Sequence, residues 1–130
     1  MKGYITNIEK ATAENADYRR VLYTAKNSQL VLMSLRAGEE MGEETHHLDQ
    51  FIRVEEGKCK VILDGVESIM EKDYAVVIPA GTKHNVINIG ETDLKLYSIY
   101  SPPEHKDGTV HKTKADAAEE HFDGKTTEEN

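Results

Sequence analysis

Short runs of apolar residues alternate with polar ones through the first hundred residues, and this period of two is typical of β-strands. Turn-forming residues separate the runs, among them Asp64-Gly65, which is a strong hairpin signal between two apolar runs. The pattern predicts strands over residues 19–24, 29–35, 51–54, 59–63, 66–70, 75–78, 86–89 and 94–100. Strands this short and this closely spaced predict an all-β sandwich or small barrel, preceded by a helical turn over residues 11–17.

The end of the chain has a different composition. Residues 101–130 contain eight acidic and four basic residues, with only Val110 and Phe122 as large apolar groups. Ser101-Pro102-Pro103 ends the last strand, because proline cannot continue a sheet. We therefore expect a β-domain over residues 1–100 and an acidic tail over residues 101–130. The tail is predicted to be solvated and partly ordered, with a short helix over residues 114–122 as the alternative.

Size and charge narrow the possible partners. A chain of 130 residues forms one ordinary domain, and its net charge of −8 argues against nucleic acid and anionic membranes as partners. A single cysteine excludes an internal disulfide and a site built from several thiolates. No apolar run is long enough to cross a bilayer or to act as a secretory signal, so we expect a soluble cytoplasmic protein.

One cluster of polar residues carries candidate chemistry. Glu44 and His46 are two residues apart and would share one face of a strand, whereas His47 would point to the other face. Gln50 begins a following strand, and His84 enters another strand after the Pro79-Ala80-Gly81 turn. A carboxylate, an amide oxygen and two imidazoles could thus converge on Mn, Fe, Co, Ni or Zn. The alternative from the spacing alone is that these are polar residues at loop ends that face water.

Two motifs in the chain resemble those of the cupin superfamily. The first contains Gly38, Glu44, His46, Gln50 and Gly57, separated by five, one, three and six residues. The second contains Pro79, Gly81, His84 and Asn88, separated by one, two and three residues. The resemblance covers about residues 29–100, and it implies a double-stranded β-helix, or jelly-roll, barrel. Compact cupins of this kind are often likened to sugar-phosphate isomerases such as mannose-6-phosphate isomerase.

The resemblance also implies a divalent metal ion on Glu44, His46, Gln50 and His84. The family usually has His at position 44, Glu at position 50 and Gly at position 73, where this chain has Asp73. The ligand charge stays at −1, and the oxygen-rich set favours Mn, Fe or Co without excluding Ni or Zn. Ile52 and Val54 lie two and four residues after Gln50, on the same face of the strand, and should face the barrel interior. Further candidate liners of the interior are Met33, Met70, Tyr97 and Tyr100.

Other reactive residues are assigned to less specific roles. We expect Cys59 to be packed and His47 to lie on the surface. We expect His105, His111 and His121 to be solvated in the tail, and Lys83 to be solvated beside His84. Outward-facing Phe51 and Arg53 would belong to the interface of a homodimer, by analogy with other small cupins.

Three functions are compatible with these features. The first is a metal-dependent enzyme, isomerase-like or dioxygenase-like, that acts on a small oxygen-rich substrate; no catalytic base is visible in the sequence for it. The second is a non-catalytic module that binds a metal or a small molecule, such as a sensor or a sugar-binding protein. The third is a structural barrel whose metal site has been lost.

Overall fold

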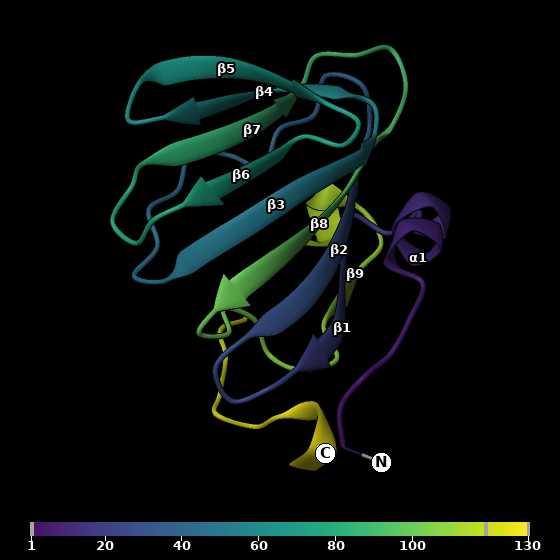
Figure 1. The fold of residues 1–130 in the computed structure, drawn as a ribbon, viewed down its shortest axis with the longest axis vertical. Coiled ribbons are helices and arrows are strands. Elements are labelled where there is room, and N and C mark those ends of the chain that lie inside the picture. The colour runs from purple at the N-terminus through teal and green to yellow at the C-terminus, as the bar shows by residue number, and fades with distance from the viewer. Residues whose placement is uncertain (1, 119, 130) are drawn as a thin grey trace.

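The computed structural model describes residues 2–118 and 120–129 and is built almost entirely from antiparallel strands (Figure 1). One α-helix comes first, and two 3-10 turns lie near the end of the chain. In chain order the elements are α1 (Ile8–Glu14), β1 (Arg19–Thr24), β2 (Gln29–Leu35), β3 (Asp49–Glu56), β4 (Lys58–Leu63), β5 (Val66–Glu71), β6 (Ala75–Ile78), β7 (His84–Asn88), β8 (Leu94–Ser101), β9 (Val110–His111), η1 (Lys114–Asp116) and η2 (Thr127–Glu129).

The strands form two sheets. The larger sheet has the order β6-β3-β8-β2-β1-β9, and the smaller has the order β5-β4-β7. Their inner faces enclose one apolar core, which includes Val31, Leu35, Val54, Leu94 and Leu96, all with no exposed surface. The predicted all-β jelly-roll barrel is therefore confirmed, with a short helix at its N-terminal end.

The alternation along β3 sorts its side chains into two sets. Ile52 and Val54 are 1% and 0% exposed, which confirms their predicted place inside the barrel. Arg53 and Phe51 point outward. Tyr97 also faces outward, where its ring lies 6.2 Å from that of Phe51. The prediction that Tyr97 lines the interior is wrong, because Tyr97 pairs with the outward Arg53 across the β3–β8 ladder.

Local sequence explains the turns that frame the sheets. Asp64 and Gly65 both have positive φ (47° and 82°) and join β4 to β5 in a two-residue hairpin, as predicted. The helical turn comes slightly earlier than expected, because the Asn7 side chain accepts a hydrogen bond from Lys10 N and starts α1 there. Asn88 donates to the carbonyls of Leu35 and Thr92, so its buried amide closes the loop after β7.

The segment that follows β8 packs against the barrel. Strand β9 pairs with β1 at the edge of the larger sheet, and Gln29 donates to the carbonyl of His105 at 2.7 Å. Thr127 accepts a hydrogen bond from Thr24 N at 2.7 Å. In the stretch where a short helix was the alternative, the described residues form one 3-10 turn at Lys114–Asp116, and Glu119 lies outside the described residues.

None of the helices within residues 2–118 and 120–129 has the length and apolar character needed to cross a membrane.

Gly57 provides a test of this backbone. It has φ of +94°, and a Cβ there would lie 2.9 Å from the carbonyl oxygen of Asp93. We expect Gly57→Ala to lower the free energy of unfolding by about 2 kcal/mol or more, since steric overlap adds to backbone strain. Gly65→Ala is the matched control, because φ is +82° but no atom lies within 4 Å of its Cβ position. That control should cost about 1 kcal/mol. Equal losses in urea denaturation would contradict the predicted overlap.

Candidate metal and ligand site

A backbone bridge sets the position of two candidate ligands. Glu44 N donates to His84 O at 2.9 Å, and His84 N donates to Glu44 O at 2.8 Å. Residues that exchange both bonds in an antiparallel pair project their side chains to the same side. The bridge therefore brings together Glu44, from the segment before β3, and His84, from the first position of β7. Gly81 N donates to His46 O at 2.8 Å and holds the same segment in place.

The side chains of Glu44, His46 and His84 meet in this region. His46 Nε2 lies 2.8 Å from Glu44 Oε2, and the rings of His46 and His84 are 5.3 Å apart. His84 Nδ1 lies 3.0 Å from Thr82 O. Because a carbonyl can only accept, Nδ1 carries a proton. In the neutral ring the lone pair then lies on Nε2, which is the arrangement typical of a metal-binding histidine.

Gln50 enters the barrel from β3 and is 2% exposed. Its Nε2 donates to Ser98 Oγ at 3.1 Å, so the side chain is held from the neighbouring strand β8. Its carbonyl oxygen, Oε1, is buried and has no hydrogen-bond partner. An acceptor buried in this way is costly, and a cation or a ligand donor would satisfy it.

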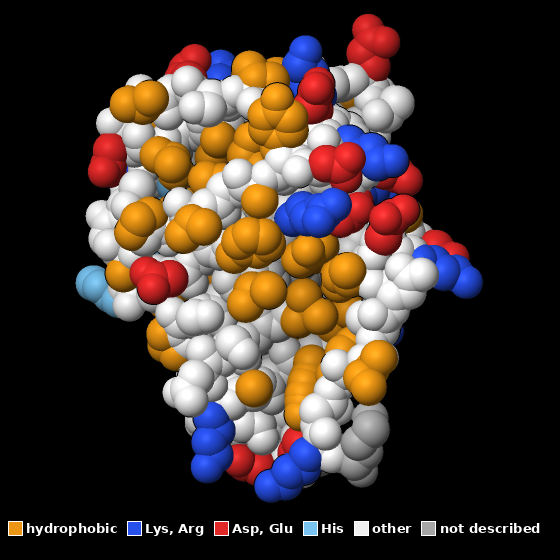
Figure 2. All heavy atoms as spheres, viewed as in Figure 1, with side chains coloured by type: hydrophobic (Ala, Val, Ile, Leu, Met, Phe, Trp, Pro, Cys, Tyr) orange, Lys and Arg blue, Asp and Glu red, His pale blue; other side chains and the backbone are white. Residues whose placement is uncertain are grey.

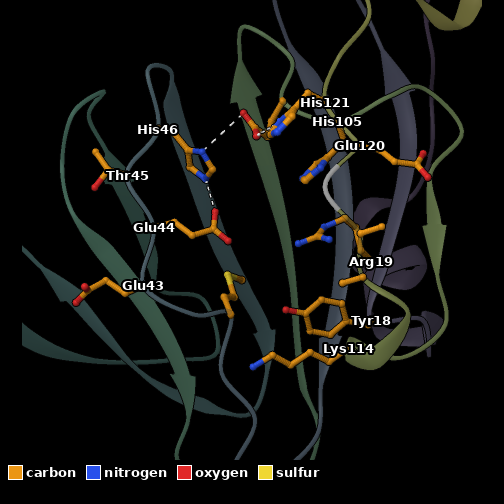
Figure 3. Close-up of a pocket in the computed structure, with 14 residues that line it drawn as sticks. Tyr18, Arg19, Glu43, Glu44, Thr45, His46, His105, Lys114, Glu120 and His121 are labelled. Carbon is orange, nitrogen blue, oxygen red and sulfur yellow. Dashed lines mark hydrogen bonds and ion pairs between the residues drawn. The ribbon is translucent and has the colours of Figure 1, made fainter.

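The two ring nitrogens of His46 both face carboxylates. Nε2 contacts Glu44, and Nδ1 lies 3.7 Å from Glu104 Oε2 (Figure 3). The hydrogen bond that His46 donates to the Glu44 carboxylate raises the pKa of His46 and lowers the pKa of Glu44. As these side chains stand, residues 2–118 and 120–129 contain no group of three or more His, Cys, Asp and Glu side chains close enough to hold a metal ion. Metal binding would therefore require His46 and Glu44 to exchange their mutual hydrogen bond for bonds to the metal.

The pocket beside this cluster is wider than the sequence indicated. It has a volume of about 590 Å³ and is lined by the start of β1 and by the segment after β8, in addition to the segment around Glu44. Among the lining residues outside the predicted metal-binding set are Tyr18, Arg19, Glu104, His105, Lys114 and His121. Sequence reasoning gave Tyr18 and Arg19 no role in the site. It assigned the other four to a solvated acidic tail, whose polar composition gives no sign of packing.

The tail histidines differ from one another. His105 is half-buried, its Nε2 is buried without a partner, and its ring lies 5.1 Å from that of Tyr100. Burial lowers the pKa of His105 to about 3, so this imidazole is neutral. His111 is 7% exposed, whereas His121 is exposed and lies 3.1 Å from Glu104. The predicted solvation is thus wrong for His105 and His111, because the tail folds over the barrel mouth.

Other sequence assignments agree with the structure. His47 is exposed, and Cys59 is 1% exposed in the core, where burial raises the pKa of its thiol to about 11. Met33, Met70 and Tyr100 are buried. Lys83 lies outside the pocket, with its ammonium 3.4 Å from Glu43.

Comparison with known proteins places the chain in a family. The cupin domain model matches residues 31–100. The uncharacterized protein YrkC of Bacillus subtilis is 50% identical over 89% of this chain, which spans 66% of YrkC, just under two thirds of its length. An uncharacterized protein of Acanthamoeba polyphaga mimivirus is 42% identical, with 82% of this chain and 70% of that protein covered.

A solved structure shows the same architecture. The crystal structure of BH2720 from Bacillus halodurans superimposes with a TM-score of 0.87 at 48% identity, covering 88% of this chain and 92% of that one. The matching region spans both motifs, the segment that carries Glu44, and the strands β3 and β7 that carry Gln50 and His84. The chain therefore belongs to the cupin family.

Proposed function

We propose that the barrel binds a divalent metal ion through Glu44, His46, Gln50 and His84, and that the protein is a metal-dependent enzyme acting on a small oxygen-rich substrate. The observation that supports this most directly is the buried, unpartnered Oε1 of Gln50. This oxygen could bind a metal ion, and no hydrogen-bond donor contacts it. It lies in the same barrel that brings Glu44, His46 and His84 together. The set of two imidazoles and two oxygens suits Mn, Fe or Co, and also Ni or Zn.

Each protein group has a role in this proposal. The metal would act as a Lewis acid on a substrate oxygen. Thr82 O holds the tautomer of His84, and Ser98 orients the amide of Gln50. His105 lines the pocket, but its Nε2 is buried and burial lowers its pKa to about 3, so it is too weak a base to take a proton from a substrate. A redox-active metal would favour dioxygenase-like chemistry, which needs few protein acid–base groups.

A second candidate function is a metal-free or non-catalytic binding module. The 2.8 Å contact between Glu44 and His46 favours it, since the two side chains satisfy each other without a metal ion. A small molecule could then bind in the pocket of about 590 Å³ through hydrogen bonds alone.

Metal content separates the two candidates. We expect the untagged protein, purified without chelator, to contain close to one metal ion per chain. The double variant His46→Ala/His84→Ala should lose it, because two imidazole ligands are removed. His47→Ala is the matched control, since this exposed neighbour of His46 should leave the metal content unchanged. Elemental analysis that finds no metal in any of the three proteins, even after reconstitution with divalent ions, would exclude the metal-dependent enzyme.

Gln50 allows a more specific test of the proposed ligand set. Gln50→Glu places a carboxylate where the side chain is 2% exposed. With chelator present, we expect a lower melting temperature, because a buried carboxylate without a cation is costly. With metal, the added charge should strengthen metal binding by about tenfold or more. Gln50→Leu should retain less metal than the parent. A Gln50→Glu variant with unchanged metal affinity would argue that Gln50 is not a ligand.

We further propose that two copies of the chain associate through the outer face of the larger sheet. Apolar side chains gather over β3, β6 and β8 on this face (Figure 2). Val77 of β6 is 64% exposed on this face. It pairs with Phe51 of β3, whose side chain also points outward. An exposed apolar surface of this kind commonly marks an interface between proteins.

Oligomeric state tests this interface. In analytical ultracentrifugation we expect a dimer for the parent and a monomer for Val77→Lys, since a lysine would be buried without a partner. Ile69→Lys is the control, because Ile69 is 49% exposed on β5 of the smaller sheet. A monomeric parent, or dissociation by the control as well, would contradict the proposed face.

A further inference from the structure

Three polar side chains line one wall of the pocket, and no sequence motif singled them out. Tyr18 and Arg19 come from the start of β1, and Lys114 is the first residue of η1. In Figure 3 the phenol oxygen, the guanidinium and the ammonium all point from this wall toward the side that holds Glu44 and His46. We call Tyr18, Arg19 and Lys114 the anion cradle.

Arg19 keeps its full positive charge in this position. No carboxylate lies within ion-pair distance of it among residues 2–118 and 120–129, and its Nε is buried with no hydrogen-bond partner. Its Nη1 lies 3.1 Å from His111 Nδ1. Because a guanidinium can only donate, His111 must accept at Nδ1, and a histidine that accepts there is neutral. His111 therefore orients Arg19 without cancelling its charge.

The other two members of the cradle are also available to a ligand. In the described part of the chain, Lys114 forms no ion pair and the Tyr18 hydroxyl forms no hydrogen bond. This differs from nearby cationic residues, since Arg20 and Lys112 both pair with Asp17. The protein has 24 acidic residues against 16 basic ones, so carboxylates that could have neutralised Arg19 and Lys114 are not scarce.

The acidic residues of the pocket are directed elsewhere. Glu44 and Glu104 both contact His46, and Glu104 also lies 3.1 Å from His121. The carboxylates of Glu43 and Glu120 point away from Arg19 (Figure 3), and Glu43 lies 3.4 Å from Lys83. The pocket thus has a cationic wall opposite the Glu44–His46 side, and an anion bound to the cradle would not meet an unpaired carboxylate there.

We infer that Tyr18, Arg19 and Lys114 bind the anionic group of the substrate, so that the protein acts on a small organic acid whose remaining oxygens face Glu44 and His46. The planar fork of Arg19 matches a carboxylate, with the phenol and the ammonium as further donors. A phosphate group offers the same acceptor chemistry, and the test below distinguishes the two. The inference names the substrate class of the proposed function, but the cradle itself needs no metal ion.

Calorimetric titration with three probes tests the cradle. L-lactate carries a carboxylate, lactamide is its neutral counterpart of similar shape, and inorganic phosphate is the alternative anion. We expect L-lactate to bind at least about tenfold more tightly than lactamide, and Arg19→Gln to abolish that preference. Arg20→Gln is the matched control, because the adjacent Arg20 is exposed and pairs with Asp17 at 3.3 Å. Phosphate that binds more tightly than L-lactate, with the same dependence on Arg19, would assign a phosphate-bearing substrate to the same cradle.

Two further variants guard against a folding defect in Arg19→Gln. Arg19→Lys keeps the positive charge but removes the two parallel N–H donors of the guanidinium. It should show a weaker preference for L-lactate over lactamide. Lys114→Gln lies on a half-buried surface turn and should reduce anion binding severalfold without changing the circular dichroism spectrum. Equal binding of L-lactate and lactamide, together with no binding of phosphate, would overturn the inference for the unaltered protein without reference to any variant.

Elemental analysis of the metal content distinguishes a failure of the anion cradle from a failure of the proposed metal-dependent function. If the parent contains metal but does not prefer anions, the metal-dependent enzyme stands and the cradle is wrong. If the parent binds no metal but prefers L-lactate through Arg19, the cradle stands and the protein is an anion-binding module.

Discussion

The reciprocal backbone hydrogen bonds between Glu44 and His84 are the constraint on which the candidate site depends. They attach the segment between β2 and β3 to the first residue of β7, and so bring together residues forty positions apart in the chain. Because the bond is made by the backbone, it fixes the facing direction of both side chains whatever they bind. The bond from Gly81 N to His46 O extends this pairing beyond the strand. Bonds from Met41 N to Val86 O and from Asn88 N to Glu39 O attach the same segment farther along β7.

The C-terminal segment forms the other half of the pocket, and it is held by polar contacts. Gln29 is 1% exposed and accepts from the backbone N–H groups of Glu104 and His105 while donating to the carbonyl of His105. Strand β9 adds to the free edge of β1 and places His111 against Arg19. A buried amide and a strand edge thus supply the fixed partners that bring His105 and Lys114 to the barrel mouth.

This mode of attachment explains what the sequence could and could not predict. The strands of the barrel were predictable, since the period of two persists wherever one face is buried, and Ile52 and Val54 lie inside as expected. The spacing of Glu44, His46 and His84 likewise indicated that they would meet. The packing of the tail was not predictable, because hydrophobic periodicity detects apolar burial and the tail is held through hydrogen bonds. The alternation of residues along the strand also did not determine which face of the sheet Tyr97 occupies. Its pairing with the outward-facing Arg53 determines this.

The distribution of charge around the pocket follows from how the two halves are held. On the barrel side, Glu44 is close to His46, which also faces Glu104, so the negative charges there already have a partner. On the side built with the tail, Arg19 is oriented by a neutral imidazole and by the ring of Tyr18, which lies 5.3 Å from the guanidinium. Neither contact neutralises a cation. Desolvating a guanidinium without a counter-ion reduces stability. A protein with an excess of carboxylates that keeps such a group at a pocket wall is therefore best understood as one in which the counter-ion arrives with the ligand.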